Sequence, residues 1–187
     1  AIGPENGKGS WMSFAVDTAE GIGNIASVAI AEVAGRAMLA YAAQNVKIAR
    51  CAVSDPLQTT PSWEIHDVAE GYEGVDICEV QGRPAVVFGA PSEIEEGMSA
   101  VFYAINTEPD GSGTWESVEV VQGDADFAYK SLGVFDGIPG VVYSCDTTDS
   151  SRLYFAYASS PDGIGSWNQN LIIEYPLVTS LFENLNG

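Results

Sequence analysis

Basic residues are scarce in this sequence. Only 7 lysines and arginines stand against 26 aspartates and glutamates, and the formal net charge is −19 at pH 7. Proteins that bind nucleic acid or anionic lipid do so through clustered basic side chains that interact with phosphate groups. We therefore expect neither a nucleic acid partner nor docking on an anionic membrane. A surface dominated by one sign of charge keeps a protein soluble and self-repelling.

Uninterrupted apolar runs are absent as well. A membrane-spanning helix needs about 18 or more such residues, and the most apolar stretch, residues 25–43, is interrupted by Glu32, Gly35 and Arg36. No membrane span is therefore expected. No signal peptide is visible, and the sequence starts at Ala1 without a methionine, which we interpret as a processed product or a fragment.

Cysteine and histidine are also few, with Cys51, Cys78, Cys145 and His66 as the only examples. No CxxC pair is present, so a zinc site is not expected. Three small buried thiols are the simplest interpretation, and one disulfide with a leftover thiol is the alternative. The single histidine could act catalytically only with partners brought from distant positions, so we expect it to be structural.

What the sequence does contain is a repeat. Its four tryptophans lie at positions 11, 63, 115 and 167, so the interval is 52 residues each time. Each tryptophan ends a short polar segment, which we name a Trp turn. Regular periods of about 20–50 residues indicate solenoids or propellers. The Trp turns are residues 5–11, 57–63, 108–115 and 160–167, and they end in Ser10-Trp11, Ser62-Trp63, Thr114-Trp115 and Ser166-Trp167.

Each repeat also contains a glycine turn between two strand-like runs. Gly35, Gly82 and Gly137 occupy corresponding positions, and the runs beside them are rich in small, β-branched and aromatic residues. The unit is strand, glycine turn, strand, variable loop, strand, Trp turn and strand, which makes four antiparallel strands. The alanines of residues 29–44 favour a helix by propensity, but register with the other copies predicts strands there.

These features predict an all-β fold: a β-propeller built of four-stranded antiparallel blades of about 52 residues, with about 3.6 units in this chain. Residues 1–187 then form a single propeller domain or part of one. A partial set of blades exposes sheet edges, so we expect a longer parent chain, or self-association with a neighbouring chain that completes the propeller. A small four-bladed ring with one thin blade is the third option. The expected segments are 1–23 (end of a blade), 24–73, 74–125 and 126–176 (blades) and 177–187 (first strand of a further blade).

The Trp turns resemble the Asp-box of the BNR repeat, which is found in sialidase-like and related propellers. The last turn has Ser160, Asp162 and Trp167 at the family's spacing, with its glycine one place late, at Gly165. The whole unit is also similar to propeller repeats of bacterial proteins. The resemblance covers nearly the whole chain and implies a propeller fold, but one fold hosts many functions.

In that family the box is a folding device, in which the aspartate accepts hydrogen bonds within its own turn and the tryptophan is buried between sheets. We expect the same role for Asp110 and Asp162, whereas Asn6 and Gln58 lack the carboxylate at this position. Binding of Ca²⁺ by the loops of Asp110 and Asp162 is a weaker alternative, because each loop offers one carboxylate. No other cofactor or metal is expected.

The resemblance implies a sialidase-like fold without the catalytic residues of sialidases. Those enzymes need an arginine cluster, a tyrosine with a glutamate partner, and an acid, and the family's arginine-containing start motif is missing here. The glutamates of residues 93–96 lie in a segment typical of a solvated loop. We therefore predict that the protein is not an enzyme. The arginines are Arg36, Arg50, Arg83 and Arg152, and the loop glutamates are Glu93, Glu95 and Glu96.

The predicted function is a non-enzymatic extracellular module for binding or adhesion, with a glycan or a protein as ligand. Tyrosines in loops at the propeller ends could stack on sugar rings. The alternative is a structural assembly protein of a virion surface, a fibre or an extracellular lattice, completed by neighbouring chains. A glycosidase is the third option. The protein is expected outside the cell or on the surface of a cell or virion, and the candidate stacking residues are Tyr72, Tyr129 and Tyr175.

Overall fold

The regular elements in the described part of the chain are β-strands. The structure is a computed structural model, and it describes residues 13, 15–18, 23–43, 48–54, 62–71 and 73–176. None of these residues belongs to a helix long and apolar enough to cross a membrane. The strands are β1 (Ile25–Val33), β2 (Arg36–Ala43), β3 (Ile48–Ser54), β4 (Trp63–Glu70), β5 (Glu73–Val80), β6 (Arg83–Pro91), β7 (Ser99–Asn106), β8 (Trp115–Gly123), β9 (Lys130–Phe135), β10 (Ile138–Asp146), β11 (Ser150–Ala158) and β12 (Trp167–Pro176).

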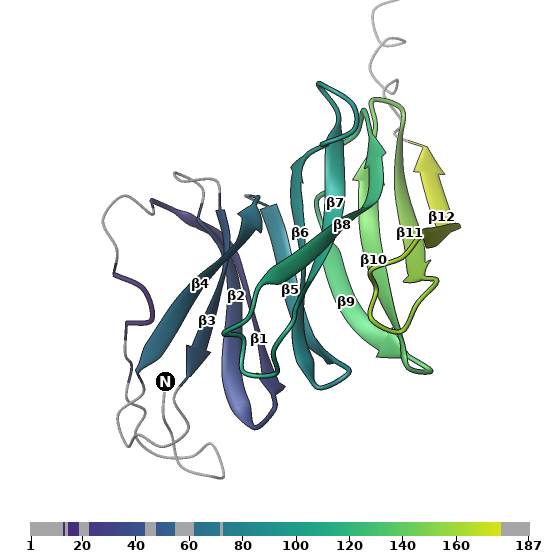
Figure 1. Ribbon diagram of the computed structural model, residues 1–187. Coiled ribbons are helices and arrows are strands. Elements are labelled where there is room, and N and C mark those ends of the chain that lie inside the picture. The colour runs from purple at the N-terminus through teal and green to yellow at the C-terminus, as the bar shows by residue number, and fades with distance from the viewer. Residues whose placement is uncertain are drawn as a thin grey trace, which may run out of the picture.

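These strands form three antiparallel sheets, each made of four consecutive strands. The first sheet is β1–β4, the second β5–β8 and the third β9–β12, and Figure 1 shows the second between the other two. The leading strands of neighbouring sheets, β1, β5 and β9, contact one another, so they form one edge of the stack, and β4, β8 and β12 form the opposite edge. This arrangement confirms the predicted all-β fold of four-stranded antiparallel units.

The glycine turns have the same backbone in all three sheets. Gly35, Gly82 and Gly137 have φ of 75°, 75° and 78°, and the residue before each also has positive φ, between 49° and 52°. Two consecutive residues of positive φ make the two-residue hairpin whose twist matches that of the strands. The turn closes the alanine-rich residues 29–43 into the β1–β2 hairpin. Tertiary pairing therefore overrides the helix propensity of this segment.

Two apolar layers hold the three sheets together. The layer between the first and second sheets includes Met38, Cys51 and Phe88. The layer between the second and third sheets includes Tyr103 and Tyr143. Alternate side chains of β6 and β7 point to opposite layers, and both strands are buried along nearly their whole length. The second sheet is therefore covered on both faces.

Within each described Trp turn, the aspartate accepts hydrogen bonds from its neighbours. Oδ1 of Asp110 accepts from the backbone N (3.1 Å) and Oγ (2.6 Å) of Ser112. Oδ1 of Asp162 accepts from Oγ of Ser160 (2.7 Å) and the backbone N of Ile164 (3.1 Å). These hydrogen bonds are the main reason why the pKa of each aspartate lies below its usual value. Both carboxylates are thus held by their own turns.

Each of these turns also packs on the preceding sheet. The tip of the 108–115 turn, Gly111, lies against Val53 of the first sheet. The tip of the 160–167 turn, Gly163, lies against the ring of Tyr103 in the second sheet. The hydroxyl of Tyr103 donates a hydrogen bond of 2.9 Å to the backbone oxygen of Asp162. The Trp turns therefore join neighbouring sheets as well as closing their own.

The tryptophans that end these turns differ in one respect. Both Trp115 and Trp167 pack against an apolar layer between sheets. Nε1 of Trp167 donates a hydrogen bond of 3.0 Å to the oxygen of Gly163. Nε1 of Trp115 is buried without an acceptor among the described residues.

The three cysteines are free. Cys51 and Cys145 are buried and Cys78 is half-buried, and burial raises the pKa of Cys51 and Cys78 to about 12. The disulfide alternative therefore finds no support in the structure. Predictions that concern Asn6, Trp11, Gln58, Tyr72 and residues 177–187 fall outside the described part of the chain.

The contact between a Trp turn and its neighbouring sheet can be tested with Gly163→Ala. Gly163 has φ of 81°, and a Cβ there would lie 2.6 Å from Cζ of Tyr103. The positive φ costs about 1 kcal/mol for alanine, and the overpacking adds about 1–3 kcal/mol. We expect the free energy of unfolding in urea to fall by that sum. The control is Gly35→Ala, which has a similar φ of 75° and open space around its Cβ, and should lose only the first part. Equal losses in both variants would contradict the contact.

Candidate functional site

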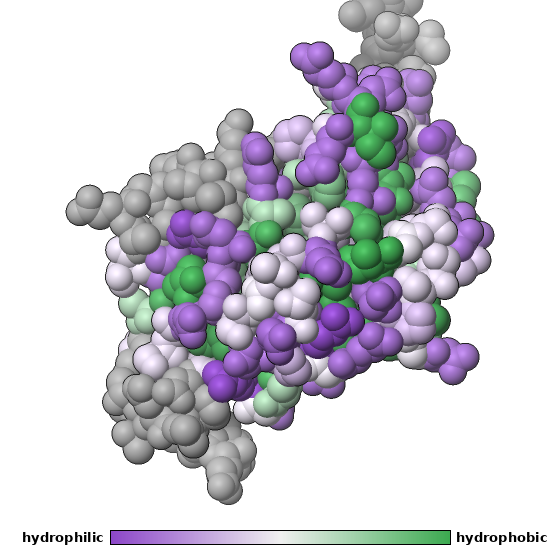
Figure 2. All heavy atoms as spheres, in the orientation of Figure 1, coloured by the Kyte–Doolittle hydropathy of each residue, from purple (hydrophilic) through white to green (hydrophobic). Residues whose placement is uncertain are grey.

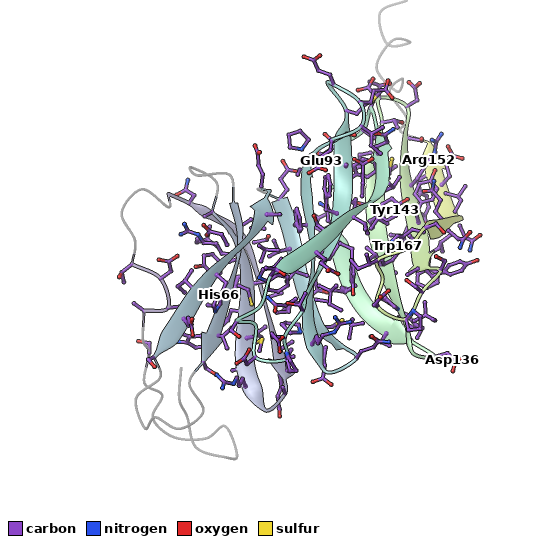
Figure 3. The ribbon with its side chains drawn as sticks, in the orientation of Figure 1. His66, Glu93, Asp136, Tyr143, Arg152 and Trp167 are labelled. Atoms are coloured by element: carbon purple, nitrogen blue, oxygen red, sulfur yellow. The ribbon has the colours of Figure 1, made fainter. Side chains whose placement is uncertain are left out.

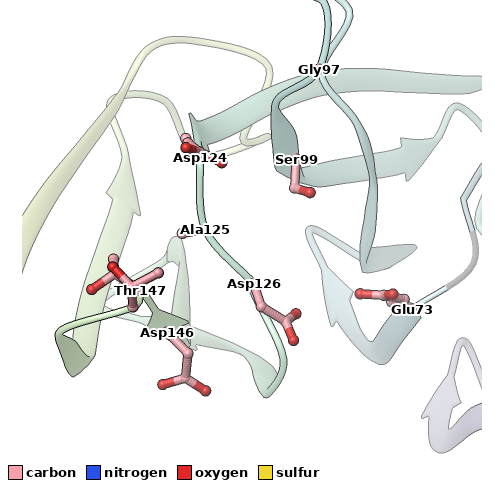
Figure 4. A pocket seen from close by; sticks show the side chains of 10 residues that line it. Glu73, Gly97, Ser99, Asp124, Ala125, Asp126, Asp146 and Thr147 are labelled. Carbon is pink, nitrogen blue, oxygen red and sulfur yellow. The ribbon is translucent and has the colours of Figure 1, made fainter. Parts of the chain in front are cut away.

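Four carboxylates surround an open pocket at one end of the second and third sheets. The pocket has a volume of about 610 Å³, and Figure 4 shows the acidic side chains that line it. Its wall comes from the start of β5, the start of β7 with the loop before it, the end of β8 with the loop to β9, and the end of β10 with the turn after it. We name it the acidic pocket; its carboxylates are Glu73, Asp124, Asp126 and Asp146.

Backbone pairing fixes two of these aspartates relative to each other. Asp126 and Asp146 form an isolated antiparallel bridge, with N···O distances of 3.0 and 2.9 Å. Asp146 also accepts a hydrogen bond from the hydroxyl of Ser151. The following turn is held by Thr147, whose Oγ1 accepts from the backbone N of Ser150 at 3.1 Å. The loop between the second and third sheets is therefore tied to the end of β10.

A lysine lies next to the carboxylates of the pocket. Lys130 opens β9 and donates a hydrogen bond to the backbone oxygen of Phe127. Burial lowers the pKa of Lys130 to about 8, although Glu73 and Asp126 act in the opposite direction. A Cβ at Gly74 would lie 2.7 Å from its Nζ, so this glycine leaves the room that the lysine side chain occupies. The result is a half-buried amine beside an acidic surface.

The arrangement suits a ligand rich in hydroxyl groups. Ionised carboxylates accept hydrogen bonds, and each oxygen offers more than one acceptor site. In the described residues, no group of three or more His, Cys, Asp or Glu side chains is placed to hold a metal ion. The carboxylates are thus spread around the hollow and do not converge on one point. Ser99 and Thr147 add hydroxyls to the wall.

The residues that sequence analysis considered for catalysis lie apart from one another. Figure 3 shows His66 on the first sheet, Glu93 at one end of the second, and Arg152 on the third. Nε2 of His66 is 3.6 Å from a Glu64 oxygen and has no hydrogen-bond partner among the described residues. Arg152 pairs with Glu174 at 2.8 Å. These residues do not form a common site.

The other arginines and the loop glutamates are also dispersed. Arg50 bridges Asp17 (3.1 Å) and Asp67 (2.8 Å) on the first sheet. Arg36 and Arg83 each follow a glycine turn. The loop of residues 92–98 is exposed and is held by Ser92, as expected for a solvated segment. On the face seen in Figure 2, polar residues cover most of the described surface.

Of the tyrosines predicted to stack on sugars, the two that the structure describes are exposed but do not line the acidic pocket. Tyr129 is 80% exposed in the loop before β9, and Tyr175 is 61% exposed near the end of β12. The sequence analysis did not find the acidic pocket itself. Its carboxylates come from residues 73, 124, 126 and 146, which share no motif. The aspartates of "GDAD", residues 123–126, were the one local signal, because they lie where one four-stranded unit passes to the next.

The comparisons with known proteins identify the scaffold. No family model and no curated protein sequence matches the chain, so the Asp-box resemblance stays a prediction. Similar folds occur in a thermostable family-43 glycoside hydrolase, with 15% identity, a TM-score of 0.49, and coverage of 77% of this chain and 54% of that one. An α-L-arabinofuranosidase from Lactobacillus brevis gives 14% identity, a TM-score of 0.50, and coverage of 79% and 53%. The chain thus spans about half the length of these proteins.

This comparison confirms the propeller fold and corrects one prediction. The sequence analysis predicted that the protein is not an enzyme. That prediction is contradicted, because a propeller of similar fold is an α-L-arabinofuranosidase. The prediction rested on the missing catalytic residues of sialidases, on a single histidine and on glutamates in a solvated loop. At 14–15% identity the likeness shows the shared fold and assigns no activity to this chain.

The half-buried amine of the pocket predicts a pH dependence. Between about pH 8 and 10 the folded Lys130 is neutral while the unfolded lysine is charged, so the unfolded state binds more protons and stability rises with pH. We expect the wild type to gain about 2–3 kcal/mol over Lys130→Met across this range, by urea unfolding at each pH. Arg152→Met, which removes an exposed cation, is the control and should run parallel to the wild type. A constant difference between the wild type and Lys130→Met would contradict the prediction.

Proposed function

We propose that this chain forms part of a propeller that hydrolyses glycosides, and that the acidic pocket is its carbohydrate site. The observation that carries the proposal is the set of four carboxylates around one open hollow of about 610 Å³. Ligand sites of small molecules have volumes of about 300–1,000 Å³. The hollow is therefore large enough for a sugar unit, and its wall offers acceptors for sugar hydroxyls.

The carboxylates of the acidic pocket suit the chemistry of glycoside hydrolysis. Such enzymes place two carboxyl groups on either side of the scissile bond, one as acid and the other as base or nucleophile. Asp126 and Asp146 are fixed by their backbone bridge, whereas Glu73 comes from the start of β5 on the neighbouring sheet. Side chains from two sheets thus face one hollow. Lys130 adds a positive charge beside Glu73 and Asp126 below pH 8.

The similar propellers support the choice of substrate class. They are named as a family-43 glycoside hydrolase and an α-L-arabinofuranosidase, which makes glycosides the first substrates to test. The likeness does not transfer their residues or their sugar to this chain. The proposal therefore depends on the acidic pocket, and the comparison with known proteins only indicates which class of ligand to test first.

The test is hydrolysis of a panel of 4-nitrophenyl glycosides, α-L-arabinofuranoside included, together with calorimetric binding of oligosaccharides. We expect Asp126→Asn to lower kcat/KM by about 100-fold or more, since it removes an acid or base while keeping the shape of the side chain. The control is Glu95→Gln in the exposed loop of residues 92–98, which should leave kcat/KM unchanged. Absence of both turnover and binding in the folded wild type would overturn the proposal. Binding without turnover would overturn its hydrolytic step.

A further inference from the structure

An aromatic cluster lies on the outer face of the third sheet, away from the second. The rings of Phe135 and Phe155 meet edge to face at 5.5 Å, and Phe155 stacks on Tyr157 at 6.0 Å. Phe135 is 56% exposed and Tyr157 38%. With Ile138 these rings line a mostly apolar hollow of about 550 Å³. We name Phe135, Phe155 and Tyr157 the aromatic face.

The aromatic face corresponds to the surface that receives a Trp turn on the other two sheets. Met38 lies three residues after Gly35 in the first sheet, and it pairs with Val53. Gly140 lies three residues after Gly137 in the third sheet, and it pairs with Tyr157. Tyr157 therefore occupies the position in the third sheet that Val53 occupies in the first. Val53 contacts the tip of the 108–115 turn. Five residues after the turn glycine, Val87 pairs with Tyr103 in the second sheet and Val142 pairs with Phe155 in the third, so Phe155 corresponds to Tyr103.

Tyr103 contacts the tip of the next Trp turn, at Gly163. The described residues place no Trp turn on the third sheet, because the two described turns pack on the first and second. The aromatic face is thus a binding surface of the repeat that remains unoccupied by the described part of the chain. A Cβ at Gly140 would lie 2.7 Å from Cε2 of Phe155, so a glycine allows the ring to lie flat on the sheet.

We propose that the aromatic face binds the Trp turn of residues 5–11 from a second copy of this chain. The two copies associate head to tail, and each donates one Trp turn and receives the other. Two identical contacts of this kind close the pair. The apolar rings lose their exposure to water in the contact, which favours association.

The charges where the Trp turns contact the preceding sheets favour the 5–11 turn as the occupant of the aromatic face. After hydrogen bonds from Ser112, the charge of Arg36 in the preceding sheet also lowers the pKa of Asp110. Arg83 acts in the same direction on Asp162. Each carboxylate-bearing turn therefore packs on a sheet that has an arginine directly after its glycine turn.

The third sheet has a different residue at this position. Ile138 follows Gly137, where the other sheets have arginine, so a carboxylate would meet no cation there. The 5–11 turn has the uncharged Asn6 at the aspartate position, so this position needs no cation; the charged residues of the turn are Glu5 and Lys8. The other turn without an aspartate at this position, residues 57–63, belongs to the first sheet through Trp63, which opens β4.

The position of Asp17 indicates that the donor is a second copy. Oδ2 of Asp17 accepts a hydrogen bond of 2.6 Å from Tyr41 and one of 3.1 Å from Arg50, on the side of the first sheet that faces away from the second. Asp17 lies six positions after Trp11, which gives a reach of about 21 Å at full extension. Three stacked sheets spaced about 10 Å apart put the opposite outer faces about 30 Å from each other. Figure 1 shows the first and third sheets on opposite sides of the second.

The proposal is tested by the mass of the full chain in solution, measured by sedimentation equilibrium over a wide range of concentration. We expect a dimer for the wild type. Tyr157→Ser on the receiving face and Trp11→Ala on the donating turn should each raise the dimer Kd by about tenfold or more. Tyr129→Ser is the control, because Tyr129 is 80% exposed but lies off the aromatic face; its Kd should not change.

Mixing the two weakened variants gives the sharpest result. The Tyr157→Ser copy retains an intact Trp11 turn and the Trp11→Ala copy retains an intact aromatic face, so their mixture keeps one complete contact per pair. We expect the mixture to associate more tightly than either variant alone, with circular dichroism showing that both are folded. A wild type that stays monomeric at every concentration overturns the proposal. A dimer unaffected by both variants, or a mixture no tighter than its components, overturns it too. None of these results bears on hydrolysis at the acidic pocket.

Discussion

The packing of a Trp turn on the preceding sheet is the constraint on which the stack depends. A four-stranded sheet has two faces, and each needs a neighbour if it is apolar. The turn provides a second attachment beyond the apolar layer, because its glycine tip lies on a side chain of the adjacent sheet. Only a residue without a Cβ can approach Tyr103 as closely as Gly163 does. The aspartate holds the turn in shape for that contact.

The fold could be predicted from the sequence because its signals are periodic. The interval of 52 residues between tryptophans and the recurring glycine turns specify where strands begin and end. Register outweighed composition in residues 29–44, where alanines favour a helix but Gly35 aligns with Gly82 and Gly137. The turns share one backbone conformation in all three sheets, which explains why so short a signal is reliable here.

The candidate site could not be predicted in the same way. Its carboxylates lie at residues 73, 124, 126 and 146, in segments that differ between copies, and the stacking of two sheets brings them together. The repeat pattern predicts only the features that all copies share, so it cannot predict positions at which the copies differ. Lys130 illustrates the same point, since its environment depends on Gly74 and Phe127, which no local pattern connects. The tests for catalysis made on the sequence therefore examined His66 and the arginines, which have structural neighbours.

The difference between Trp115 and Trp167 has a consequence for the local opening of the stacked sheets. Trp167 is anchored through its indole N–H to its own turn, whereas the indole N–H of Trp115 is buried without an acceptor among the described residues. An unpaired buried donor costs about 1–3 kcal/mol. Among the described residues, the indole of Trp115 therefore adds no hydrogen bond where it packs between the first and second sheets. Local opening of a stack of similar units begins at the contact between neighbours that is held least firmly.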